Sequence, residues 1–291
     1  MMKKHTVLYS IIILLLFFCF PEVIISSSTS YYFRTLGIND GLSQSTVNAI
    51  LQDQKGFMWI GTKDGLNQYD GQECRVFQKE NSSLGNNFIT ALYEDCEGYI
   101  WVGTDAGVYI YNPVQEAFQF LDTEIASSGE KITRAVTWIT SDSQNNIWIS
   151  VDNQGLFCYN RGKKNLTKVV SCGKSGIANV THFWFYAGQL WIARYEDNLY
   201  VSKDNSSFNA FNDVDGEDIF KGLVINSYVE GLHNCLYVGT SKGLMEINLT
   251  SRKVRKLLDE YVRDICFRSD TDLWIGTEQG LYIYNSLVEL N

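Results

Sequence analysis

Short apolar stretches alternate with polar turns along most of the chain, and one such unit returns several times. Residues 56–66 read GFMWIGTKDGL, and closely similar stretches begin at residue 98 (GYIWVGTDAGV) and residue 273 (LWIGTEQGL). A copy with tyrosine in place of tryptophan, LYVGTSKGL, begins at residue 236, and two weaker copies, IWIS and LWIA, begin at 147 and 190. Each copy carries one anchoring aromatic residue: Trp59, Trp101, Trp148, Trp191, Tyr237 and Trp274.

The anchors are 42, 47, 43, 46 and 37 residues apart, and this period is typical of a β-propeller blade. In the first unit, alternating residues predict strands at 47–52, 57–61, 66–69 and 73–78. Asp53 begins a polar turn, and Asp64-Gly65 is a strong hairpin signal because glycine accepts a positive φ. A small residue two positions after each anchor suggests close packing against the next blade. The sequence therefore predicts an all-β propeller of four-stranded blades.

The two ends of the repeat region are complementary. A shift of 42 residues lays 31–36 on the fourth strand at 73–78, although no blade precedes it. The last unit ends at its third strand, residues 282–284. Pairing the two ends would close the ring and remove two exposed sheet edges. The six anchors leave open a six-bladed ring or an incomplete seven-bladed ring.

The first thirty residues have the layout of a secretory signal peptide, with Lys3 and Lys4 ahead of an apolar run at 7–20. An uncleaved N-terminal anchor is the alternative. We therefore divide the chain into a signal peptide at 1–30 and a propeller domain at 31–291, and we expect the protein to be periplasmic. Six of the seven cysteines follow the signal region, and we expect them to pack singly as small hydrophobic residues, although disulfides are possible.

The remaining composition excludes several functions. The chain has 24 basic and 33 acidic residues, a net charge of −9, and this balance is unsuited to nucleic acid. After residue 30 the histidines are His182 and His233, and their spacing fits no zinc ligand set or catalytic motif. We expect no metal, no cofactor and no catalytic residues. The sequence Asp53-Gln54-Lys55-Gly56 resembles a calcium loop, but an Asp-capped turn explains it better.

Departures from the repeat indicate candidate binding residues. The third unit has one extra residue in the turn between its second and third strands, and the fourth replaces Thr-x-x-Gly by residues 194–198, RYEDN. In a propeller these turns share one face around the central channel. Mixed donors and acceptors beside an aromatic ring suit a sugar. The predicted ligand-binding residues are Lys63, Asp64, Asp105, Asp152, Asn153, Arg194, Tyr195, Glu196, Lys242 and Glu278.

The opening stretch at 33–71 resembles the start of hybrid two-component regulators of Bacteroides-type bacteria. The similarity rests on FRTL at 33–36, DGLS at 40–43, VNAI at 47–50 and GFMWIGTKDGLNQYDG at 56–71. The resemblance extends over nearly all of 31–285. It implies a periplasmic sensor built from two-component regulator propeller repeats, with two seven-bladed propellers, a β-sandwich, a membrane span, a kinase, a receiver and a DNA-binding domain in the whole family member.

This chain holds six anchors where the family's first propeller has seven blades, and no kinase or receiver motif is present in it. The resemblance implies a fragment, a truncated gene product or a short relative that carries the sensor module without kinase activity. The expected partner is an oligosaccharide derived from a glycan used by the cell. A propeller scaffold that binds a protein or a second propeller is the alternative, and a propeller lyase is a weaker one.

Overall fold

The computed structural model describes residues 31–169, 180–205 and 207–285. Contacts divide the chain into residues 1–36 and 37–291, and the second unit is described by itself. The predicted signal peptide lies outside the described residues. In the described ranges, no helix is both long and apolar enough to cross a membrane.

Six antiparallel sheets follow one another along the chain, after a short 3-10 helix, η1 (Ile38–Asp40). The first two are β1 (Val47–Gln52), β2 (Met58–Thr62), β3 (Gly65–Tyr69), β4 (Cys74–Phe77), and β5 (Ile89–Glu94), β6 (Ile100–Thr104), β7 (Gly107–Asn112), β8 (Ala117–Phe120). The next two are β9 (Val136–Ser141), β10 (Ile147–Val151), β11 (Gly155–Asn160), β12 (Asn165–Lys168), and β13 (Val180–Tyr186), β14 (Gln189–Arg194), β15 (Leu199–Ser202), β16 (Asn209–Ala210). The last two are β17 (Ile225–Glu230), β18 (Cys235–Thr240), β19 (Gly243–Asn248), β20 (Val254–Leu258), and β21 (Val262–Phe267), β22 (Asp272–Thr277), β23 (Leu281–Asn285).

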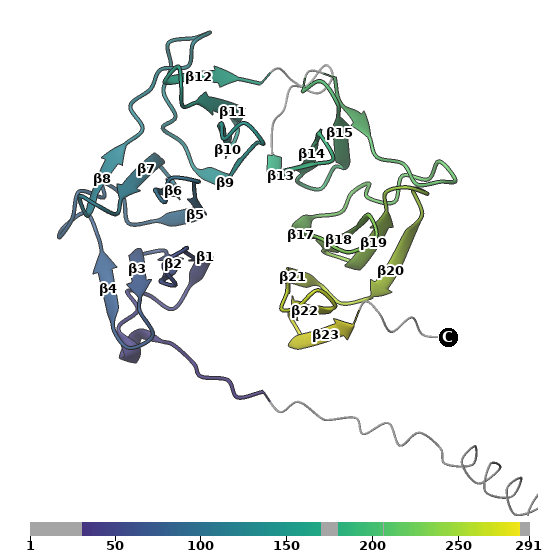
Figure 1. Cartoon of the computed structure of the whole chain (residues 1–291), viewed down its shortest axis with the longest axis horizontal. Helices are drawn as coiled ribbons and strands as arrows, with labels where there is room; N and C mark the ends of the chain where they lie inside the picture. The colour runs from purple at the N-terminus through teal and green to yellow at the C-terminus, as the bar shows by residue number, and fades with distance from the viewer. Residues whose placement is uncertain (1–30, 170–179, 206, 286–291) are drawn as a thin grey trace, which may run out of the picture. The chain divides into compact units, whose positions relative to one another are not determined.

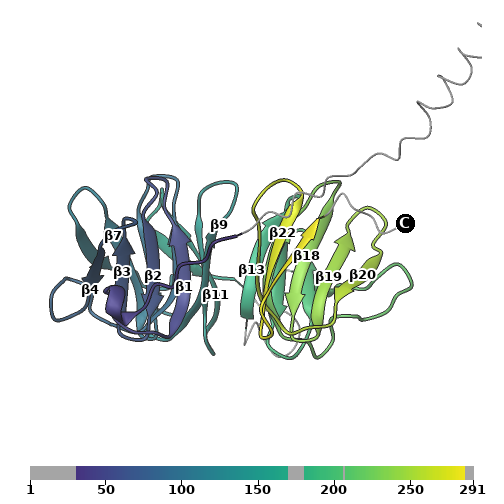
Figure 2. The same ribbon diagram turned by 90° about the horizontal axis from the view of Figure 1, so that it is seen from below.

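The sheets are the blades of a β-propeller, which confirms the predicted fold class. Figure 1 shows them arranged around a common axis, with the first strand of each blade innermost. Strand order within each sheet follows the chain, so every connection inside a blade is a simple antiparallel turn. Figure 2 shows the blades edge-on, with connecting turns at the two ends of the strands.

Hydrophobic clusters lie between consecutive blades. The cluster between the first and second blades combines Trp59 and Leu66 with Val102 and Tyr111, and equivalent clusters join each following pair up to the fifth and sixth blades. The anchors of the first five blades are at most 5% exposed, as predicted. Burial of these rings stabilises the contacts between neighbouring blades.

The small residue two positions after the anchor has the predicted packing role in the first, second and fifth blades. A Cβ built on Gly103 would lie 2.7 Å from Cγ1 of Val136, the first residue of the next blade's inner strand. Gly61 and Gly239 face Ile89 and Val262 in the same way. The second, third and sixth blades therefore each insert a β-branched side chain against the backbone of the blade before them.

The sixth blade departs from this scheme and corrects two predictions. Among the described residues its sheet contains the three strands β21, β22 and β23, and β23 pairs there with β22. Residues 31–36 form no strand, so the prediction that they are a fourth strand is wrong. Trp274 is only half-buried, unlike the other anchors. The reason is that none of the described hydrophobic clusters joins the sixth blade to the first. Val47, whose counterparts in the later blades are buried, is accordingly 39% exposed.

The described cysteines, Cys74, Cys96, Cys158, Cys235 and Cys266, are free thiols. Cys158 and Cys235 pack against hydrophobic clusters, in line with the prediction of singly packed cysteines. Cys96 and Cys266 are exposed, so that prediction fails for these two. Cys172 lies outside the described residues.

Candidate functional site

The turns between the second and third strands of the blades define one face of the propeller, which we call the turn face. In the first blade Thr62 Oγ1 accepts a hydrogen bond from the Asp64 amide (3.0 Å) and donates to the Gly65 carbonyl (3.0 Å). Gly65 has a φ of 128°, which favours glycine. The second, fifth and sixth blades repeat this threonine lock with Thr104, Thr240 and Thr277. The lock fixes the turn, and both central residues are exposed in the first, second and sixth blades.

All ten predicted ligand-binding residues lie on turns of this face, and all except Arg194 are exposed. Several already have partners within the protein. Asn87 Nδ2 donates to Asp64 Oδ1 at 3.3 Å, and Asn153 Nδ2 donates to Asp152 Oδ2 at 3.0 Å. The structure thus brings the ten residues to one end of the blades, and their binding role stays a prediction.

The turn of the fourth blade has the most distinctive surface. The guanidinium of Arg194 forms an ion pair with Asp197 (2.9 Å) and lies 5.7 Å from the ring of Tyr200. Its side chain is 15% exposed, so a ligand would have to compete with Asp197 for it. Tyr195, in contrast, is 53% exposed, and Glu196 beside it has a left-handed φ of 49°. Tyr195 and Glu196 are therefore the accessible part of this turn.

Two residues of the sixth blade that sequence reasoning missed extend this surface. The charge of Glu196 and a hydrogen bond to it raise the pKa of Tyr195, and Tyr261 makes a smaller electrostatic contribution in the same direction. Arg263 lies 4.7 Å from the ring of Tyr261 and forms an ion pair with Glu278 at 2.5 Å. The sequence held no signal for Tyr261 and Arg263, because they lie outside the repeated turn. We call Tyr195, Glu196, Tyr261, Arg263 and Glu278 the turn-face cluster.

The opposite face carries the turns between the first and second strands, and these are structural in the first three blades. Asp53 Oδ1 accepts from the Lys55 amide (3.0 Å) and the Phe57 amide (2.9 Å), and Oδ2 accepts from Trp59 Nε1 (2.8 Å). Asp95 and Asp142 hold Trp101 and Trp148 in the same way. The predicted Asp-capped turns are confirmed, and no group of three His, Cys, Asp or Glu suited to a metal occurs in the part of the chain that the structure describes.

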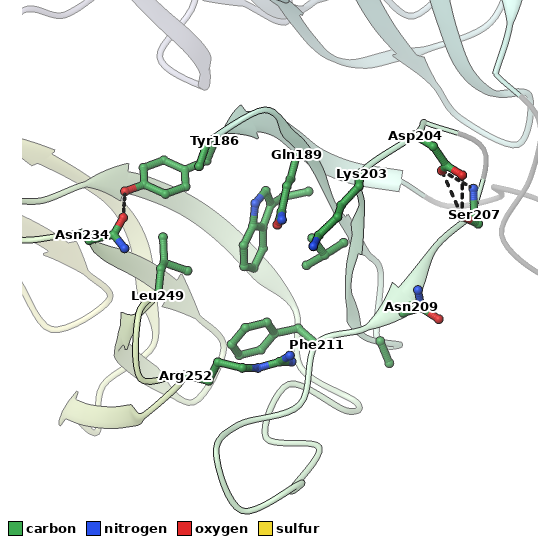
Figure 3. A pocket seen from close by; sticks show the side chains of 14 residues that line it. Tyr186, Gln189, Lys203, Asp204, Ser207, Asn209, Phe211, Asn234, Leu249 and Arg252 are labelled. Atoms are coloured by element: carbon green, nitrogen blue, oxygen red, sulfur yellow. Dashed lines mark hydrogen bonds between the residues drawn. The ribbon is translucent and has the colours of Figure 1, made fainter.

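Pockets also open on this opposite face between neighbouring blades. One of about 500 Å³ lies between the fourth and fifth blades and includes Trp191, Gln189, Lys203, Phe211 and Arg252 in its lining. Figure 3 shows Gln189 and Lys203 pointing into it and Arg252 lying beside Phe211. Its volume is within the range of small-molecule sites. Another of about 510 Å³ occupies the equivalent place between the first and second blades.

Comparison with known proteins supports the predicted resemblance. The two-component regulator propeller model matches residues 41–64, 83–106 and 256–279, which include the first, second and sixth repeated turns. A histidine kinase of Formosa agariphila is 40% identical over 53 residues, covering 18% of this chain and 4% of the kinase. The predicted relation to two-component regulator propellers is confirmed.

Solved structures show the same relation. The extracellular domain of one hybrid two-component system of B. thetaiotaomicron is 26% identical with a TM-score of 0.73, over 88% of this chain and 36% of that one. A second such domain from B. thetaiotaomicron is 18% identical with a TM-score of 0.59, over 89% of this chain and 43% of that one. This chain therefore spans less than half the length of these relatives. Virginiamycin B lyase of Staphylococcus aureus, 11% identical with a TM-score of 0.62 over 86% of this chain and 87% of the lyase, shares the fold alone.

Proposed function

We propose that this chain is the sensor propeller of a hybrid two-component regulator, located in the periplasm, and that its turn face binds an oligosaccharide derived from a glycan. The repeat matches and the similarity to extracellular domains of such systems support the sensor role. The ligand class is inferred from the side chains of the turn face. Those similar proteins are extracellular domains of two-component systems, which supports a propeller that recognises a ligand without transforming it.

The observation that carries the ligand proposal is the exposed ring of Tyr195 within the turn-face cluster. Aromatic rings bind the apolar face of a sugar, and the carboxylate of Glu196 and the guanidinium of Arg263 can bond its hydroxyl groups. The cluster combines turns of the fourth and sixth blades, so a ligand of more than one sugar unit would contact two blades at once. Such a ligand would couple its binding to the relative position of the two blades, and this would provide a signal to the rest of a regulator.

Titration calorimetry with a panel of oligosaccharides tests the proposal on the whole chain. For any ligand that binds, Tyr195→Phe should retain affinity because the ring remains, and Tyr195→Ala should weaken binding about tenfold or more. Val114→Ala is the control, because Val114 is highly exposed on the opposite face. Binding that survives both Tyr195→Ala and Arg263→Ala would contradict a site at the turn-face cluster.

A second candidate function, interaction with a protein, is favoured by the outer strand of the sixth blade. Within the described residues β23 pairs only with β22, and Leu281, Tyr282 and Ile283 on it are exposed. An unpaired strand edge can accept a strand from a partner protein. Ile283→Lys should abolish such an association in light scattering, while saccharide binding at the turn face should remain unchanged.

A further inference from the structure

The pocket between the fourth and fifth blades differs chemically from its counterpart between the first and second. The two occupy equivalent positions, which the strand pairing makes explicit. In the first blade Trp59 pairs with Gln68, which pairs with Arg75. In the fourth blade Trp191 pairs with Val201, which pairs with Asn209. The two pockets can therefore be compared residue by residue.

The fourth blade lacks the carboxylate that accepts a hydrogen bond from the anchor tryptophan in the first blade. Asp53 precedes Trp59 by six residues and accepts from its indole, whereas the residue six before Trp191 is Phe185. Among the residues that the structure describes, none accepts a hydrogen bond from the buried Trp191 Nε1. An unpartnered buried donor is rare in proteins. The fourth blade therefore lacks the carboxylate that Asp53, Asp95 and Asp142 supply in the first three blades.

The other blade that lines each pocket, the second or the fifth, also differs in charge. Asn112 caps the turn that leads to Glu116, and Asn248 caps the equivalent turn that leads to Arg252. Glu116 and Arg252 both have left-handed φ values, of 50° and 60°. Glu116 forms an ion pair with Arg75 at 2.8 Å across the first pocket. In the second pocket Arg252 stands in the place of Glu116. A cation has therefore replaced an anion at this position.

The balance of charge around the two pockets is opposite as a result. The pocket between the first and second blades is lined by four carboxylates and two cations, Asp53, Glu94, Glu97, Glu116, Lys55 and Arg75. The pocket between the fourth and fifth blades is lined by Lys203, Arg252 and one carboxylate, Asp204. Asp204 already accepts hydrogen bonds from Ser202 and from the amide and hydroxyl of Ser207. An excess of positive charge here is notable in a chain of net charge −9.

Arg252 is held in place before any ligand arrives. Its Nε and Nη2 donate to the Asn212 carbonyl at 3.1 and 2.7 Å, and its guanidinium lies 5.1 Å from the ring of Phe211. Two of its nitrogens are thus used to fix the side chain, and further donor hydrogens remain on the guanidinium. A side chain ordered in advance costs little entropy when it binds a ligand.

We propose that this pocket binds an acidic sugar, whose carboxylate interacts with Arg252 and Lys203. The amides of Gln189 and Asn209 supply donors and acceptors for the hydroxyl groups. The site lies on the face opposite the turn-face cluster, so it is independent of the saccharide site proposed there.

Calorimetry on the whole chain tests this site with two hexuronates, glucuronate and galacturonate, against their neutral parents, glucose and galactose. At least one hexuronate should bind about tenfold more tightly than its parent, since a hydrogen-bonded charge contributes at that level. The affinity should fall as salt is added. Equal binding of acids and neutral sugars, or acetate and sulfate binding as tightly as the hexuronates, would overturn the proposal.

Two variants locate the binding. Arg252→Glu restores the residue type of the first pocket and should abolish hexuronate binding. The variant also loses the bonds to the Asn212 carbonyl, so its melting temperature is measured alongside to show that it remains folded. Arg255→Gln, three residues away and paired with Glu246 outside the pocket lining, is the matched control and should bind normally. The indole N–H resonance of Trp191, assigned with Trp191→Phe, should shift on adding hexuronate. Normal hexuronate binding by Arg252→Glu would refute the proposed site. Tyr195→Ala should leave hexuronate binding in this pocket unchanged.

Discussion

At the scale of single residues, the buried pair of aspartate and tryptophan is the main polar element of the first three blades. One oxygen of Asp95 accepts from the amides of Glu97 and Tyr99, and the other accepts from Trp101 Nε1 at 2.7 Å. Arg161 of the next blade approaches the same carboxylate at 3.2 Å. One side chain thus fixes a turn, an anchor and a contact between blades.

We expect Asp95→Ala to be strongly destabilising, because it leaves the indole and two amides without an acceptor. The cost in free energy of unfolding should be about 2–4 kcal/mol. Urea denaturation measures it. The control is Asp105→Ala on the exposed turn of the same blade, which should change stability by less than about 0.5 kcal/mol. A similar small change for Asp95→Ala would mean that these bonds contribute little.

His182 gives the stability a dependence on pH. Its Nδ1 is buried without a partner among the described residues, and its ring lies 4.6 Å from that of Trp138. Burial lowers the pKa of His182 to about 4, with only partial compensation from a hydrogen bond to the Ile225 backbone. The unfolded chain therefore takes up this proton near pH 6.5, before the folded chain does.

As a result, stability attributable to His182 should be complete above about pH 7 and should be lost between about pH 6.5 and 4. The loss should be on the order of 2 kcal/mol at pH 4.5. We would compare urea denaturation of the wild type and His182→Gln at pH 7.5 and 4.5. The variant should lose less stability on acidification. Identical losses in both proteins would show that His182 is not protected from protonation.

At the scale of strands and blades, the contact between a glycine and a β-branched residue sets how closely blades approach. The sequence predicted this role, because a small residue recurs two positions after the anchor. The partner side chains, such as Val136 against Gly103, were not predicted, because they begin the next unit and follow loops of different lengths. Repetition within a unit is visible in sequence, whereas contact between units depends on how blades stack.

Gly103→Ala and Gly276→Ala form a matched pair that tests this contact. A Cβ at Gly103 would lie 2.7 Å from Val136 Cγ1 and 3.0 Å from Ala91 Cβ, whereas at Gly276 the nearest atom is the Asp264 carbonyl oxygen at 3.5 Å. We expect Gly103→Ala to cost about 1–3 kcal/mol and Gly276→Ala less than about 0.5 kcal/mol. Thermal and urea denaturation measure both. Equal costs would indicate that the blades can separate without penalty.

At the scale of the whole molecule, the repeat period was sufficient to predict the six blades and the face on which their turns gather. It did not predict the strand content of the last blade. A shift of 42 residues aligns 31–36 with a fourth strand, but alignment gives no information about the angle between blades. Because no described cluster packs the sixth blade on the first, the structure leaves Val47 exposed and Trp274 half-buried.

The candidate site was predictable to a similar extent. The departure of the fourth unit from Thr-x-x-Gly correctly indicated an exposed Tyr195. It did not reveal that Arg194 pairs with Asp197, because that pairing depends on the conformation of the new turn. The charge reversal at Arg252 was also overlooked, since it appears only when turns of equivalent blades are compared in register.

The central claim is that a saccharide binds the turn face of a sensor propeller, and hydrogen exchange with and without a bound oligosaccharide tests it most directly. Slowed exchange should be confined to turn-face peptides that include Tyr195, Lys242 and Tyr261. Acidic sugars should add protection near Trp191 and Arg252 if the second pocket is also occupied. Ligand binding that leaves exchange at 194–198 and 259–264 unchanged would contradict the claim.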